Sequence, residues 1–202
     1  HIGREMQELT GVLRNSPTMP AIDSALAGQG VLNMLNTRYL IYSPEQPPLS
    51  NPHALGDAWF VDELRWVKNA DEEIAELGRI DPGTTAIVDE RYRAEVGEVR
   101  VVADSTAHVE RTAYATNKLT YKVNSAQGGV VVFSEIWYGP DWKATIDGTP
   151  AAHFRADYVL RAMTMPAGEH TVEFHIESKP FHTSRPIAMA SSGLVLLLVL
   201  AA

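Results

Sequence analysis

The chain of 202 residues contains no cysteine. This absence excludes disulfide bridges, thiolate metal sites and a cysteine nucleophile together. Clustered basic side chains are also missing, because the 17 Lys and Arg residues are scattered and the formal net charge is -8. Proteins that bind nucleic acid present a basic patch or stripe on their surface. We therefore expect no nucleic-acid partner.

The usual catalytic and metal-binding motifs are absent as well. The seven histidines form no i, i+2 or i, i+4 pair, and the sequence has neither HExxH nor GxSxG nor a glycine-rich phosphate loop. We expect no metal, no cofactor and no catalytic residue within this chain. A pair of acids that meets only in space, as in glycosidases, stays open. The acids available for such a pair are Asp104, Glu135, Asp141, Asp147 and Asp157, of which Asp141 and Asp147 occupy turn positions.

The first half of the chain mixes helix and strand signals. Residues 1–20 are polar and end in prolines, which is typical of a surface lead-in. Asp23 predicts the start of a helix over residues 24–36. Asn69, followed three residues later by Glu72, predicts a second capped helix that ends near Leu77. Expected strands lie at residues 38–42, 58–67 and 84–88.

The second half contains strand signals alone. Asp147-Gly148 predicts a tight hairpin, because such a turn needs positive φ at both central residues. Six short strands at this spacing indicate an antiparallel β-sandwich of the jelly-roll or immunoglobulin-like kind. The expected fold class is α+β, with a mixed α/β subdomain over residues 1–98, the sandwich over 99–180, and a linker with the start of a transmembrane helix over 181–202. The expected strands lie at residues 108–114, 119–123, 130–138, 142–146, 158–165 and 171–176.

The C-terminal segment has no charged side chain from Ile187 to Ala202. Leu194 to Leu200 would be apolar on every face of a helix, unlike the stripe of a surface helix. A helix that crosses a bilayer needs ~20 apolar residues. The segment therefore indicates the opening of a membrane span, although a buried C-terminal helix is the alternative. Lys179 and Arg185 precede it, and the positive-inside tendency would prefer such residues in the cytoplasm.

Aromatic side chains gather around one turn of the second half. Trp137, Tyr138 and Trp142 flank this turn, and flat rings of this kind stack on sugars. Arg155, Asp157 and Tyr158 follow on the facing segment, where they could hydrogen-bond sugar hydroxyls. These six residues are the candidate glycan-contact site. The alternative is that the two tryptophans are packing partners that stabilise the hairpin.

Three blocks of sequence resemble one bacterial family. They are VLNMLNTRYLIYS (Val31–Ser43), NPHALGDAWFVDEL (Asn51–Leu64) and the segment from Phe133 to Ile176, which carries IDG and PAGEHTVEF. Together with the apolar tail, they look like the C-terminal extracytoplasmic region of YfhO-type membrane proteins, in their Bacteroidetes-type form. The positions that match the pattern of the third block are Trp142, Asp147, Gly148, Arg155, Tyr158, Arg161, Pro166, Gly168 and His170.

The resemblance implies a multi-pass parent protein similar to GT-C glycosyltransferases, which use a lipid-linked sugar donor. Such a parent would modify cell-envelope glycans or lipids at the bacterial cell membrane, with this domain on the extracytoplasmic side. Its catalytic acid would lie in a loop outside this chain, so no catalytic residue is carried over. The implied partners are the membrane-embedded remainder of the same polypeptide and a glycan or lipid-linked sugar. The alternative function is a carbohydrate-binding or purely structural extracellular domain.

Overall fold

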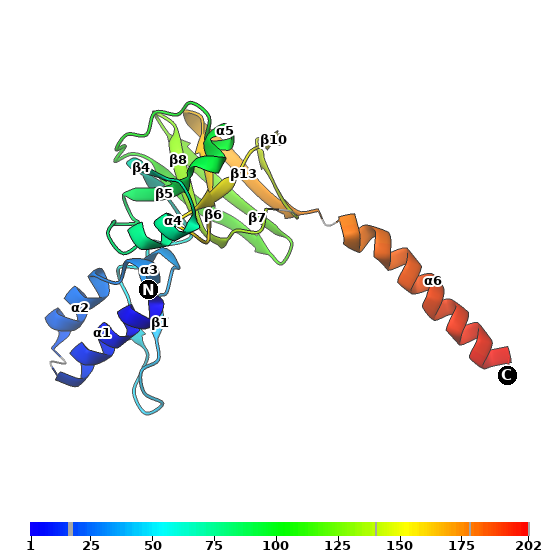
Figure 1. The fold of residues 1–202 in the computed structure, drawn as a ribbon, viewed down its shortest axis with the longest axis horizontal. Coiled ribbons are helices and arrows are strands. Elements are labelled where there is room, and N and C mark those ends of the chain that lie inside the picture. Colours follow the sequence, from blue (N-terminus) through cyan, green and yellow to red (C-terminus); the bar gives the residue numbers. More distant parts are fainter. Residues whose placement is uncertain (16–17, 140, 178, 202) are drawn as a thin grey trace.

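The protein has an α+β fold whose C-terminal half is rich in sheet, as the sequence predicts. The computed structural model describes residues 1–15, 18–139, 141–177 and 179–201. Two antiparallel sheets pack face to face, and a small parallel pair of strands lies against the outer face of one of them (Figure 1). Residues 16–17, within the predicted lead-in, and Ala202, at the end of the predicted tail, lie outside the described residues.

The N-terminal segment is helical, so the prediction of a surface lead-in over residues 1–20 is wrong. The single helix expected over residues 24–36 is also wrong, because Gly28-Gln29-Gly30 interrupts it where helix propensity is low. Leu9 explains the first difference, since it lies in the middle of a helix and is buried against Ile22 and Leu26. The three helices are α1 (Ile2–Asn15), α2 (Met19–Ala27) and α3 (Gly30–Met34).

Glu5 attaches α1 to α3. Its buried carboxylate accepts hydrogen bonds from the backbone N–H of Val31 at 2.9 Å and of Leu32 at 3.0 Å. These donors belong to the first turn of α3, where backbone N–H groups have no partner inside the helix. The first helix is therefore held by a specific polar contact as well as by apolar packing.

The segment 58–67 forms two strands in different sheets, where the sequence predicts one strand. The strand β3 (Ala58–Val61) pairs with the sandwich, whereas β4 (Glu63–Val67) pairs in parallel with β5 (Thr85–Asp89). Helix α4 (Ala70–Glu76) connects β4 to β5. Its predicted cap is confirmed, because the Asn69 side chain accepts a hydrogen bond from Glu72 N at 3.0 Å. The short elements around this unit are β1 (Tyr39–Leu40), β2 (Leu49–Ser50), the 3-10 helix η1 (Glu90–Tyr92) and α5 (Arg93–Val96).

The sandwich consists of a five-stranded sheet, in the order β10-β9-β13-β7-β6, and a four-stranded sheet, in the order β11-β12-β8-β3. Every neighbouring pair in them is antiparallel. The six expected strands are present, but the fifth begins at Leu160 because residues 157–159 form a loop. A further short strand precedes that loop. The bounds are β6 (His108–Ala115), β7 (Lys118–Ser125), β8 (Gly129–Ile136), β9 (Trp142–Ile146), β10 (Thr149–Ala151), β11 (Phe154–Ala156), β12 (Leu160–Met165) and β13 (Gly168–Ile176).

The four-stranded sheet is the central layer and is covered on both faces. On one face Phe133 meets Tyr121 and Phe174 of the other sheet, with ring centroids 4.9 and 5.0 Å apart in edge-on arrangements. On the other face Val132 and its neighbours pack in one cluster with Ile87 of β5. This second core combines residues from both sides of position 98. The division of the chain into domains after residue 98 stays a prediction.

Helix α6 (Lys179–Ala201) extends away from the sandwich (Figure 1, orange to red). Its exposed apolar side chains include Ile187, Met189, Leu197 and Leu200. Among the described residues, no helix combines the length and the apolar character needed to cross a membrane.

Candidate functional site

The hairpin between β11 and β12 presents three of the six predicted site residues. Ala156 pairs with Leu160, so the loop between them consists of only three residues. Asp157 and Tyr158 both have left-handed backbones, with φ of 50° and 69°. Aspartate tolerates this region, whereas a bulky residue such as Tyr158 is strained there and persists only where its surroundings hold it. The contacts of this loop therefore define the candidate site.

Asp157 holds the loop against β5. Its backbone N–H donates to Ile87 O at 2.9 Å, and its Oδ1 accepts from Ile87 N at 2.8 Å. The side chain is completely buried, and its second oxygen, Oδ2, has no hydrogen-bond partner. Burial is the main cause that raises the pKa of Asp157 to about 7, against the opposing effect of the Ile87 N–H. This residue is thus an acid whose neutral form is populated near neutral pH.

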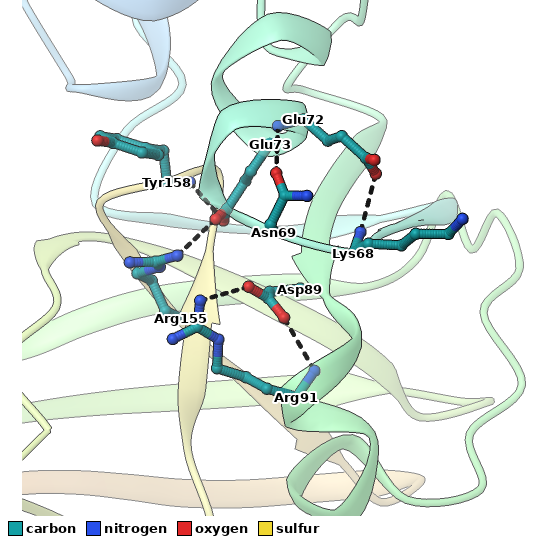
Figure 2. A network of polar contacts seen from close by, with 8 residues as sticks. All are labelled: Lys68, Asn69, Glu72, Glu73, Asp89, Arg91, Arg155 and Tyr158. Carbon is teal, nitrogen blue, oxygen red and sulfur yellow. Dashed lines mark hydrogen bonds and ion pairs between the residues drawn. The ribbon is translucent and has the colours of Figure 1, made fainter.

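Glu73 of α4 binds the other two residues of the loop region (Figure 2). Its carboxylate accepts from Arg155 Nη2 at 2.6 Å and from the backbone N–H of Tyr158 at 2.8 Å. The Glu73 side chain is 0% exposed, whereas that of Arg155 is 18% exposed. Burial raises the pKa of Glu73, and the Tyr158 N–H and Arg155 oppose that rise. A buried ion pair of this kind fixes the loop to α4 but offers no free carboxylate.

Asp89, at the end of β5, completes the polar cluster in Figure 2. It accepts hydrogen bonds from the backbone N–H and from the guanidinium of Arg91. The Arg91 side chain is the largest cause that lowers the pKa of Asp89. Because Asp89 and Glu73 each carry a paired arginine, the cluster is balanced in charge.

Trp137 belongs to an aromatic group beside the same loop, and its backbone N–H donates to Val159 O at 2.7 Å. Its ring centroid is 4.8 Å from that of His153 and 5.9 Å from that of Tyr92. A side chain at Gly139 would come within 2.5 Å of the Trp137 ring, so glycine is required there. The next residue, Tyr138, is 57% exposed. The exposed Tyr138 ring therefore lies next to Trp137, whose ring contacts His153 and Tyr92.

Trp142 faces the interior of the sandwich instead of the Trp137 group. The Arg161 guanidinium lies 4.1 Å from the Trp142 ring centroid and 5.1 Å from that of Phe174. Arg161 is 2% exposed, donates to Ile136 O through Nε and Nη2, and leaves Nη1 without a partner. Burial lowers its pKa, and Glu135 nearby opposes that effect. This cation–π contact accounts for Trp142 as a packing residue.

The structure thus divides the six predicted residues. Arg155, Asp157 and Tyr158 form one buried polar unit with Glu73, and Trp137 and Tyr138 flank a second, partly exposed surface. The Trp142 ring packs on Arg161, while its backbone hydrogen-bonds to Tyr138 O and to His153 beside the second surface. Sequence reasoning missed Glu73, although it lies on the helix that the Asn69 cap predicts, because nothing local shows that a glutamate on a short helix will be buried.

Most of the acids that could form a pair in space already have hydrogen-bond or ion-pair partners. Asp147 accepts from Thr171 N at 2.8 Å and pairs with His170 at 2.7 Å, while Asp104 accepts from Thr106 and Ser125. In the described part of the chain, no group of three or more His, Asp or Glu residues could hold a metal ion. The arrangement offers an exposed ring at Tyr138 and one buried acid, Asp157, whose pKa is raised to about 7 by burial.

Comparison of the chain with protein-family models, with curated proteins and with solved structures finds no match.

Proposed function

We propose that the chain is an extracytoplasmic domain of a bacterial membrane protein and assists a multi-pass glycosyltransferase-like parent in cell-envelope glycosylation. The membrane part of this proposal rests on the exposed apolar side chains of α6. The glycosylation part rests on the sequence blocks that resemble YfhO-type proteins and on the aromatic surface at Trp137.

The side chains of α6 favour a lipid environment. Leu196, Leu197, Val199 and Leu200 are between 62% and 78% exposed, although they are successive or nearly successive on the helix. Successive helical residues point in different directions around the axis, so apolar surface is exposed on more than one side. Large continuous apolar surfaces mark sites that contact proteins or membranes. We propose that lipid covers this helix.

Flotation of the full chain with vesicles of phosphatidylethanolamine and phosphatidylglycerol tests this step. The chain is expected to float with the vesicles, and Leu197→Arg should weaken its partition more than about tenfold, because a charge in the apolar layer is unfavourable. Ile41→Arg is the matched control, since Ile41 is 77% exposed but lies in a loop after β1. If the unaltered chain stays unbound, or if both variants behave alike, lipid does not cover α6.

A glycan-contact role is the second component, and Tyr138 favours it. This ring is exposed beside Trp137, which His153 and Tyr92 hold from two sides. Rigid aromatic rings give contact area at low entropic cost. Arg155 and Asp157, by contrast, are engaged in the buried unit, so the proposed contact now rests on Trp137 and Tyr138.

An array of bacterial envelope oligosaccharides, probed with the full chain, tests the contact. Tyr138→Ala should abolish any binding signal, whereas Tyr39→Ala should leave it unchanged, because Tyr39 is 69% exposed on β1. Silence of the unaltered chain would contradict glycan contact and favour a structural role of the domain within the parent. Membrane binding by α6 is measured separately and can hold in either case.

A further inference from the structure

The strand β4 presents an unpaired edge to an open groove. Among the described residues, β4 pairs with one strand only, β5. A groove with a volume of about 780 Å³ is lined by residues 62–64 and Trp66 at β4 and by residues 96–101, which lead out of α5. An edge strand exposes a row of backbone groups that can pair with another chain. The groove therefore borders an edge to which a further strand can be added.

The backbone of β4 fixes which groups face this groove. Glu63 N donates to Thr84 O at 3.1 Å, at the start of the β4–β5 pair. Alternate residues of a strand direct their backbone groups to the same edge, so Glu63 and Arg65 face β5. The N–H and C=O groups of Leu64 and Trp66 therefore point to the free edge. Neither residue has a backbone hydrogen-bond partner outside the β4–β5 pair among the described residues, and both line the groove.

Residues 98–101 add further unpaired backbone groups to the same groove. They lie outside regular helix and strand, and their N–H groups donate to no partner within the part of the chain that the structure describes. Val99 and Val101 are partly buried against the same core as Leu64 and Trp66. The groove thus combines main-chain donors and acceptors with apolar side chains.

This combination selects an extended peptide as the ligand. An extended backbone offers N–H and C=O groups at every second residue along one edge, as Leu64 and Trp66 do. A helix uses its own backbone groups internally and leaves those of β4 without partners. A sugar is unsuitable, because the apolar side chains of Val99 and Val101 would leave its hydroxyls unpaired.

The charged residues of the groove indicate the charge of that peptide. Three of them, Asp62, Glu98 and Arg100, form no ion pair among the described residues. The two others, Glu63 and Arg93, already pair with residues outside the groove. Unpaired acid is therefore in excess, and complementary charge helps to select a partner. The groove favours a peptide with a net positive charge.

We propose that β4 binds an extended, positively charged segment of a partner protein as an added antiparallel strand. In an antiparallel pair, directly opposite residues exchange both backbone hydrogen bonds, and their side chains lie on the same face. Apolar residues of the bound segment would therefore lie opposite Leu64 and Trp66. This surface is independent of α6 and of the Trp137 surface.

Titration of the isotope-labelled full chain by NMR, with the peptide acetyl-KVTVTVK-amide as the probe, tests the proposal. The backbone amide signals of Leu64 and Trp66 should shift saturably, and their hydrogen exchange should slow. Exchange at Arg65, which already faces β5, should not change. Absence of saturable shifts at Leu64 and Trp66 would overturn the proposal.

Two altered peptides separate the contributions to binding. The same peptide with N-methyl groups on its valines cannot donate to β4 and should bind at least about tenfold more weakly. Equal affinity of the methylated peptide would overturn strand addition. The peptide acetyl-EVTVTVE-amide should also bind more weakly, and equal affinity in this case would overturn the preference for positive charge.

Two substitutions at one position locate the binding. Leu64→Pro removes an outward N–H and no hydrogen bond to β5, and proline is tolerated on an edge strand in that orientation. Leu64→Ala is the matched control, because it also shortens the side chain but keeps the N–H. The proline variant should bind acetyl-KVTVTVK-amide at least about fivefold more weakly than the alanine variant. Equal affinities would overturn pairing at Leu64. If Leu64→Pro unfolds the chain, the comparison of methylated and unmethylated peptides on the unaltered chain still decides the question.

Discussion

Two tight turns of the sandwich place an aspartate in the left-handed region, and they treat it in opposite ways. Asp147, with φ of 52°, begins the β9–β10 turn and is exposed, and Gly148 follows it. Asp157, with φ of 50°, begins the β11–β12 loop and is completely buried, and Tyr158 follows it. The pKa of Asp147 is lowered, chiefly by its hydrogen bond to His170, whereas burial raises that of Asp157. The surroundings of each aspartate, and not its place in a turn, therefore decide whether its pKa is raised or lowered.

The two turns also differ in how the strain is compensated. Each aspartate hydrogen-bonds to the backbone of another strand. In the β9–β10 turn the next residue is a glycine, which adopts positive φ without steric conflict. The β11–β12 loop has no glycine and relies on distant partners, namely Glu73 and Ile87. Tertiary contacts therefore hold the left-handed backbone of Tyr158 in place.

The largest expected effect concerns the pH dependence of the buried turn. The pKa of Asp157 is about 7 in the folded chain and near 3.8 when unfolded, so the folded state binds the proton more tightly. The contribution of Asp157 to stability is therefore fully present below pH ~4 and is lost as the pH rises through about 7, by at most about 4 kcal/mol. Asp157→Asn should flatten this part of the profile, because asparagine stays neutral, accepts from Ile87 N and tolerates left-handed geometry.

Urea unfolding of both proteins between pH 4 and 8 measures the difference. Glu73 leaves some dependence of the same sign in the variant, since its pKa is also raised. Parallel profiles of the two proteins would show that Asp157 titrates normally in the folded state.

The second effect tests the ion pair that holds the buried turn. Arg155→Ala leaves the Glu73 carboxylate buried without its cation and should lower the free energy of unfolding by about 3 kcal/mol at pH 7. Adding Glu73→Gln should recover part of the loss, because the buried group becomes neutral. Lys118→Ala is the control: its pair with Glu173 is half-exposed and is expected to contribute less than about 1 kcal/mol. Equal losses in the two single variants would contradict the difference between buried and exposed pairs.

The third effect tests the role of Gly148, which gives the exposed turn a residue that adopts positive φ without strain. Gly148→Ala should lower the free energy of unfolding by about 1 kcal/mol, because φ is 79° there. A Cβ at this position would touch nothing within 4 Å, so the change isolates the backbone. Gly11→Ala in α1, where a Cβ also meets nothing, should have the opposite sign, since alanine favours helix. A neutral result at Gly148 would show that the turn tolerates other geometries.

These two turns also show what the sequence could predict. Asp147-Gly148 is a local signal, and the structure confirms positive φ at both residues. The Asn69 cap is equally local and is likewise confirmed. Strand positions in the second half follow from residue type and turn spacing. On β13, Val172 and Phe174 of the expected inward face (His170, Val172, Phe174, Ile176) are buried, His170 is half-buried and Ile176 is exposed. Patterns within a few residues of one another were sufficient for these features.

Features that depend on distant contacts could not be predicted. The loop at Asp157 depends on Ile87, which is 70 residues away. Glu73 joins the cluster through Arg155 and Tyr158, which are 82 and 85 residues away. Helix α1 depends on burial of Leu9 and Glu5 against later helices. In each case the local sequence permits several structures, and tertiary packing selects one.

The smallest expected effect concerns the pair of Asp147 with His170 on the exposed turn. Hydrogen bonds to Asp147 and then to Ala167 O raise the pKa of His170 above its usual value. The pH dependence has the opposite sign to that of Asp147, whose pKa is lowered. A histidine with a raised pKa contributes to stability below its unfolded pKa near 6.5, and this contribution is lost as the pH rises through its folded pKa. Asp147→Asn should return the pKa of His170 toward 6.5, with little change in stability because solvent screens the pair. Histidine ring signals followed by NMR against pH measure this directly. If His170 titrates identically in both proteins, the Ala167 carbonyl sets its pKa and Asp147 does not. The exposed turn would then depend on backbone contacts, as the buried turn does.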